Sequence, residues 1–211
     1  MRVTSLAAAA TLLAATTAAA QAPAGQPTTI AVNIQRGYAT IKTNLTQAAE
    51  KMAEADYAFK PSAMPEARTY GALLAHVAQS QFGTCASVKG VPNPMMGRQL
   101  ETELKTKAEI AKALADSFAF CDDAYSSLTD ANISEMITGR GGQTARAAVL
   151  GNNVTHDNEM AGTVYAYMRA KGLVPPSTEN AAAARGGGGG GARGGAPGGG
   201  RGAGTPPPGQ N

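Results

Sequence analysis

The sequence predicts an all-α protein built as a four-helix bundle. Four segments carry apolar residues at steps of three and four, which places them on one helix face: residues 29–55, 69–89, 106–128 and 144–171. Residue types that favour helix starts and stops flank these segments. No segment shows the period-two alternation of a half-buried strand, so we expect no sheet.

The first helix, residues 29–55, has a long apolar stripe. Pro27 lies just before it, where the missing proline N–H does not interrupt the helix. Pro61 and Pro65 break any helix in the connection that follows. The stripe consists of Ile30, Ile34, Tyr38, Ile41, Leu45, Ala48 and Met52.

The second and third helices have clear start signals. Thr69 is a suitable N-cap for the second helix, and Gly90 and Pro92 end it. Thr106 and Glu109 have the spacing of a capping box at the start of the third. The last helix ends at Gly172, which favours a left-handed cap that Val174 can complete by an apolar contact, before Pro175 and Pro176.

A long connection separates the second and third helices. Antiparallel neighbours need only short loops, so we expect a crossover and a parallel pair. Cys85 and Cys121 lie at similar depths in their helices, and at a rise of about 1.5 Å per residue they reach similar heights in a parallel pair. Two interpretations stay open, a disulfide and a pair of buried free thiols.

Both ends of the chain of 211 residues differ from the bundle in composition. Residues 1–20 have the pattern of a signal peptide, with Arg2, an apolar Ala/Leu run and small residues before the cleavage point. Residues 180–211 are rich in Gly, Arg and Pro and are expected to be disordered. Residues 21–179 therefore form the bundle, and the protein is expected to be exported, to the periplasm or the extracellular space.

Charge and hydropathy exclude two classes of partner. The formal net charge is only +3, and three arginines of the tail supply a matching amount, so nothing indicates nucleic-acid binding. The tail also lacks aromatic residues to stack on bases. After signal cleavage no remaining segment is long and apolar enough to span a membrane.

The chemical signal is a pair of histidines on two different helices. His76 lies at the edge of the apolar stripe of the second helix, and His156 lies on the inner face of the last, with Asn153 on the same row and Asp157 beside it. Buried polar groups need partners, so this polar waist is unusual for a structural bundle. Imidazole is a good ligand for zinc or nickel, although two ligands are few for a protein site.

A histidine in the second helix and a last helix ending YAYMRAKGLVPP (residues 165–176) resemble the DinB-like superfamily over about residues 30–176. The resemblance implies an up-down-down-up bundle, often a homodimer. It also implies a metal held by one histidine of the second helix and a His-x-x-x-His pair of the last. His76 and His156 match the first two ligands, and Met160 occupies the third position. Glu159, one turn from His156, is a candidate substitute.

The sequence does not identify a reaction, so several functions stay open. The family resemblance implies that a protein with such a site can act as a metal-dependent thiol transferase or hydrolase. A rival is a metal-free, non-catalytic module for binding or stress in the cell envelope. A third is a cavity for an apolar small molecule lined by Met52 and Met160. The metal hypothesis predicts that the imidazoles of His76 and His156 approach a common point.

Overall fold

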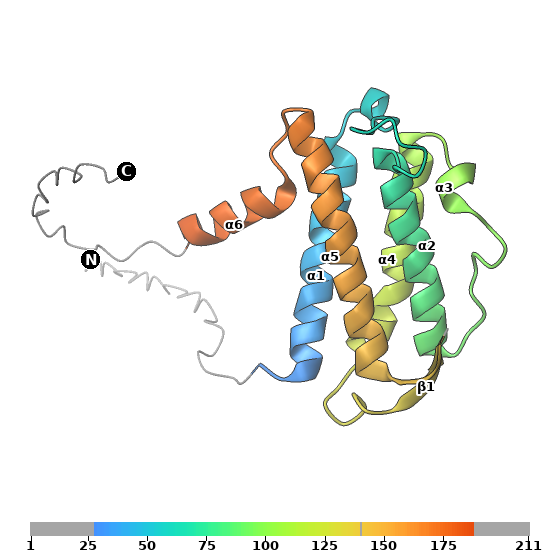
Figure 1. The fold of residues 1–211 in the computed structure, drawn as a ribbon. Helices are drawn as coiled ribbons and strands as arrows, with labels where there is room; N and C mark the ends of the chain where they lie inside the picture. Colours follow the sequence, from blue (N-terminus) through green and yellow to red (C-terminus); the bar gives the residue numbers. More distant parts are fainter. Residues whose placement is uncertain (1–27, 140, 188–211) are drawn as a thin grey trace, which may run out of the picture.

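The computed structural model describes residues 28–139 and 141–187. Four long helices pack side by side as a bundle (Figure 1). They are α1 (Ile30–Lys51), α2 (Tyr70–Lys89), α4 (Lys107–Ser126) and α5 (Arg146–Ala170). In Figure 1, α1 and α5 run upward, and α2 and α4 run downward. The predicted all-α class agrees with this architecture. No helix among the described residues is long and apolar enough to cross a membrane.

Threonines begin three of the four long helices. The hydroxyl oxygens of Thr29, Thr69 and Thr106 accept hydrogen bonds from backbone N–H groups in the first turn of α1, α2 and α4. Glu109 completes the capping box at the start of α4. The N-cap at Thr69 and the capping box predicted from the sequence are therefore confirmed.

The end of α5 confirms the predicted glycine cap and corrects its apolar contact. Gly172 has a φ of 73°, in the left-handed region. The N–H of Leu173 donates to the carbonyl of Met168 at 2.9 Å, which is the long bond of a Schellman motif. Leu173 packs against the core, whereas Val174 is exposed, so Leu173 makes the contact expected of Val174.

The predicted boundary of the disordered tail at residue 180 differs from the structure. Helix α6 (Pro176–Gly187) extends beyond that point, because a proline is well suited to the first turn of a new helix. Lys51 contacts Glu179 at 2.5 Å, and Asn180 donates to Asn44 at 2.8 Å, which fastens α6 to α1. The signal peptide predicted at 1–20 and residues 188–211 of the tail lie outside the described residues.

A short hairpin replaces part of the linker expected before the last helix. Strands β1 (Met136–Gly139) and β2 (Gly142–Ala145) pair antiparallel, with Gly139 opposite Gly142. Gly142 has a φ of 106°, which a side chain would disfavour. Strands of four residues are too short to produce a recognisable alternation, so the sequence pattern missed them.

The crossover between α2 and α4 carries one helical turn, α3 (Leu100–Glu103), and a shorter 3-10 turn, Glu54–Asp56, follows α1. Leu100 is buried and anchors α3 on the bundle. A disulfide joins Cys85 of α2 to Cys121 of α4, with their Cα atoms 5.3 Å apart. Of the two interpretations left open by the sequence, the structure therefore has the disulfide.

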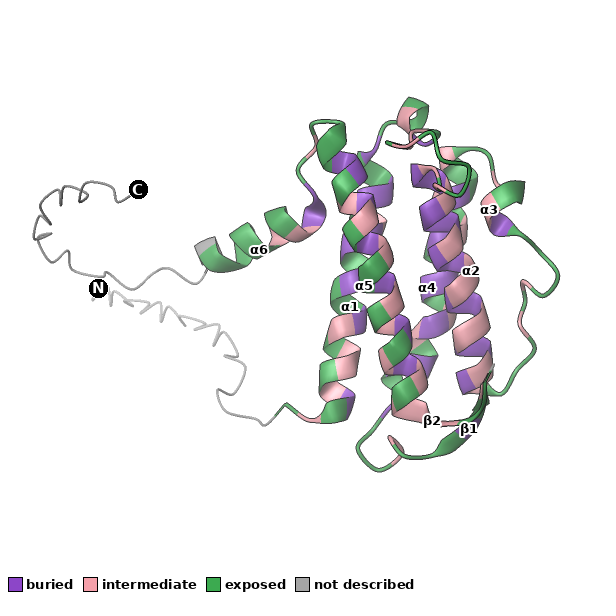
Figure 2. Cartoon of the chain, in the orientation of Figure 1, coloured by how far each residue is buried: buried purple, intermediate pink, exposed green. Residues whose placement is uncertain are grey.

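Buried residues line the inner faces of the four long helices, whereas most of α6 is exposed (Figure 2). The Tyr38 and Tyr125 rings stack at 3.7 Å between centroids in the core. Four polar side chains are also almost fully buried between the helices: Gln81, Ser117, Asn153 and Asp157. Asp157 contacts His156, and Asn153 connects Asp157 to Gln81.

Candidate metal centre

The two histidines of the chain meet on neighbouring helices. His76 lies on α2 and His156 on α5, and their Nε2 atoms are 3.1 Å apart. The two side chains are 27% and 28% exposed, so the pair is partly accessible to solvent. The sequence placed both residues on inner or near-inner helix faces, and the structure brings the imidazoles to a common point.

Each histidine contacts a carboxylate through its other ring nitrogen. The Nδ1 atom of His76 lies 2.5 Å from Glu101 Oε1, and that of His156 lies 3.2 Å from Asp157 Oδ1. The result is a continuous row of carboxylate, imidazole, imidazole and carboxylate. Metal-binding histidines commonly have such an outer carboxylate, which fixes the orientation of the ring.

Asp157 ends the row inside the core. Its side chain is fully buried, and burial raises the pKa of its carboxyl, although the contact with His156 acts in the opposite direction. Asn153, one turn earlier, lies 3.4 Å from it and donates to Gln81 Oε1 at 2.8 Å and to the Tyr125 hydroxyl at 2.9 Å. Hydrogen bonds of this kind let polar groups occupy a bundle interior.

Glu101 ends the row at the surface. Burial acts to raise the pKa of its carboxyl, but hydrogen bonds from Arg68 and His76 outweigh it and hold that pKa below its ordinary value. The Nε atom of Arg68 donates to Glu101 Oε2 at 2.6 Å. Glu101 is therefore ionised near neutral pH and accepts hydrogen bonds on both sides.

The two imidazole nitrogens are spaced as two ligands of one zinc or nickel ion would be. When both carboxylates accept a proton from Nδ1, the Nε2 atoms of His76 and His156 present lone pairs to one another. That arrangement is repulsive unless a cation lies between them. Two imidazole nitrogens bound to one tetrahedral zinc at about 2.0–2.1 Å are about 3.3 Å apart, close to the observed 3.1 Å.

The sequence matches the DinB superfamily over residues 38–164. This match spans more than half of the chain. The chain belongs to the DinB superfamily. The resemblance stated from the sequence is thus confirmed.

Solved structures of DinB-like proteins share the fold. One from Bacillus cereus ATCC 10987 aligns with a TM-score of 0.55 and 16% identity, covering 68% of this chain and 93% of that one. Another, from Bacillus subtilis, aligns with a TM-score of 0.51 and 19% identity, covering 67% and 94%. At these identities the likeness concerns the fold alone. No curated protein matches the chain.

Neither residue considered as a third metal ligand in this DinB-superfamily chain, Glu159 or Met160, completes a three-ligand site. Glu159 is exposed, and Met160 is half-buried against the core. Among residues 28–139 and 141–187, no third His, Cys, Asp or Glu joins the two histidines in a group able to hold a metal. Methionine sulfur is a poor ligand for zinc or nickel.

Sequence reasoning missed Glu101 and found Asp157 only as part of the polar waist. Glu101 lies in the long connection, where no periodicity assigns a residue to a face. Glu101 lies within α3, and a helical turn of four residues is too short to be predicted from apolar spacing. Asp157 immediately follows His156, and a buried contact between adjacent residues has no helical spacing to indicate it.

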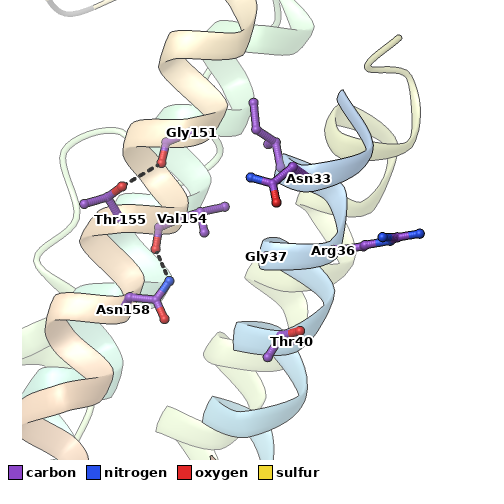
Figure 3. Close-up of a pocket in the computed structure, with 9 residues that line it drawn as sticks. Asn33, Arg36, Gly37, Thr40, Gly151, Val154, Thr155 and Asn158 are labelled. Carbon is purple, nitrogen blue, oxygen red and sulfur yellow. Dashed lines mark hydrogen bonds between the residues drawn. The ribbon is translucent and has the colours of Figure 1, made fainter. Parts of the chain in front are cut away.

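Two hollows of the surface are lined by neither histidine. One is a groove between α1 and α5, where Thr155 donates to the carbonyl of Gly151 and Asn158 to that of Val154 (Figure 3). Among the residues that line it, Arg36 alone is titratable: Asn33, Ile34, Arg36, Gly37, Thr40, Gly151, Val154, Thr155 and Asn158. The other hollow lies between the C-terminal end of α2 and the hairpin.

Proposed function

We propose that this DinB-superfamily protein binds one divalent transition-metal ion, zinc or nickel, through His76 and His156. The observation that carries the proposal is the 3.1 Å separation of the two Nε2 atoms, with a carboxylate on each Nδ1. The carboxylates hold the rings in the orientation that a ligand pair needs. Solvent or a substrate would supply the remaining ligands.

Such a site supports metal-dependent hydrolysis or thiol transfer. A bound metal ion of this kind lowers the pKa of a coordinated water or thiol, which makes a nucleophile near neutral pH. The side chains of His76 and His156 are 27% and 28% exposed, so the pair is in contact with solvent. The side chain of Arg68, which is 40% exposed and contacts Glu101, adds a positive charge beside the pair.

A second candidate is a metal-free, non-catalytic bundle. The missing third ligand among the described residues favours it. In that form one histidine donates an N–H···N hydrogen bond to the other across the 3.1 Å gap. The pair would then serve as a polar clasp between α2 and α5.

Metal content distinguishes the two candidates. The protein is purified without chelator and without a His-tag, offered Zn²⁺ and Ni²⁺ in separate samples, and analysed for bound elements. We expect about one metal ion per chain, lost in His76→Ala and in His156→Ala. Glu159→Gln is the matched control, and it should retain the metal because Glu159 is exposed. Absence of metal from the reconstituted wild type would leave the metal-free candidate.

We also propose that the protein is exported, to the periplasm or the extracellular space. The disulfide between Cys85 and Cys121 supports this, because structural disulfides persist mainly in oxidising compartments. The pattern of residues 1–20 points the same way. Alkylation of thiols in intact cells, followed by fractionation, should find both cysteines protected. Free thiols in a cytoplasmic fraction would refute the proposal.

A further inference from the structure

The crossover between α2 and α4 delivers a carboxylate to the edge of the histidine pair. Glu101 of α3 contacts His76 through Oε1 at 2.5 Å and Arg68 through Oε2 at 2.6 Å. His76 and Glu101 are 25 residues apart in the sequence, so the contact depends on how the crossover docks. Arg68, which precedes α2, closes the cluster from the other side.

Gln79 holds the crossover in place. Its Oε1 atom accepts a hydrogen bond from the N–H of Leu100 at 2.8 Å, and its Nε2 atom donates to the carbonyl of Arg98 at 3.2 Å. Gln79 lies three positions after His76, so both side chains project from the same face of α2. Leu100, which is buried, fixes the turn that carries Glu101.

This arrangement decides which nitrogen of His76 carries the proton. The carboxylate of Glu101 is an acceptor, and Arg68 can only donate to it. The Nδ1 atom of His76 must therefore be the donor in its contact with Glu101. Its Nε2 atom is then left with a lone pair directed at His156.

We propose that Glu101 is a positioning residue that locks His76 in the Nδ1–H form, so that Nε2 is free to bind a cation shared with His156. The identity of that cation rests on the proposed function, but the tautomer does not. The crossover is thus part of the site, because Gln79 and Leu100 set the position of the carboxylate.

The test compares Glu101→Gln with Glu103→Gln, a control on the same turn whose carboxylate pairs with Arg98 at 2.7 Å. In Glu101→Gln the amide oxygen must face Arg68, because a guanidinium offers only donors. The amide NH₂ then faces Nδ1 of His76 and forces the proton to Nε2. The variant retains the size of the side chain, and circular dichroism checks that it folds.

The readout is the tautomer of both histidines in chelator-treated protein, from long-range ¹H–¹⁵N correlation spectra. His156→Ala assigns the two rings. We expect His76 as Nδ1–H in wild type and Glu103→Gln, and as Nε2–H in Glu101→Gln. Zinc affinity, by competition with a chromophoric chelator, should fall about 10–100-fold in Glu101→Gln and stay unchanged in Glu103→Gln.

An unchanged His76 tautomer in Glu101→Gln would overturn the inference, even if the wild type binds zinc. If the wild type binds no zinc but His76 changes tautomer in Glu101→Gln as expected, the result would refute the proposed function and support the inference. Glu101→Ala provides a second variant. It should abolish the preference for Nδ1–H without imposing Nε2–H, because no side chain then faces Nδ1.

Discussion

Removal of the disulfide should destabilise the bundle strongly. The perturbation is the double substitution Cys85→Ala and Cys121→Ala, which removes the covalent link between α2 and α4. For a sequence separation of 36 residues, the loop-entropy relation gives a loss of about 3.8 kcal/mol at 25 °C. Both side chains are fully buried, so the lost sulfur atoms leave small voids that add to this loss. At about 2–4 °C per kcal/mol, the melting temperature should fall by about 8–15 °C.

The assay is urea unfolding followed by far-ultraviolet circular dichroism. Oxidised wild type, the double variant and wild type unfolded and refolded with reductant are compared. Reduced wild type retains the sulfur atoms, so it separates the effect of the cross-link from that of the voids. A loss below about 1 kcal/mol in both samples would refute the reasoning, because the cross-link would then barely restrict the unfolded chain.

Four further predictions concern packing, helix propensity, charge and the ligand set. Gly71→Ala should destabilise the fold by about 1–3 kcal/mol, because a Cβ there would lie 2.8 Å from Ile110 Cδ1 and 3.3 Å from the backbone oxygen of Tyr57. At Gly162 an added Cβ would meet nothing within 4 Å, so Gly162→Ala should stabilise α5 by up to about 1 kcal/mol. Urea midpoints equal to that of the wild type would contradict both predictions. Burial raises the pKa of Asp157, so metal-free wild type should lose stability relative to Asp157→Asn as pH rises above about 4. Parallel stability curves in denaturant titrations from pH 4 to pH 7 would exclude a raised pKa. Met160→His adds an imidazole one turn from the pair and should raise zinc affinity at least about tenfold by chelator competition, whereas unchanged affinity would show that this position does not face the site.

The long helices could be predicted from local signals. Thr69, Thr106 and Gly172 mark their ends through bonds within one turn, and such bonds depend on a few neighbouring residues. The boundary at α6 was missed because a Pro-Pro pair both ends one helix and begins the next. The hairpin was missed because each strand has only four residues, too few for a recognisable alternation of apolar and polar positions.

Some residues of the candidate site could likewise be predicted from the sequence, and others could not. His76 and His156 could be found because each lies on a helical face whose direction the apolar spacing gives. Glu101 could not, because its place depends on how Leu100 and Gln79 dock a crossover without periodicity. Glu159 was a reasonable candidate by helical spacing, but a position three residues from His156 also lies on the flank of the helix, and there it is exposed.

The two histidines are separated by 80 residues along the chain. Neither α2 nor α5 alone presents both imidazoles, so under the proposed function a metal ion would meet its full pair of protein ligands only after the last helix has docked. A polypeptide that crosses a membrane unfolded would therefore acquire its metal at its destination, from the ions present there. The metal that occupies the site would then reflect the chemistry of that compartment as well as the preferences of the two imidazoles.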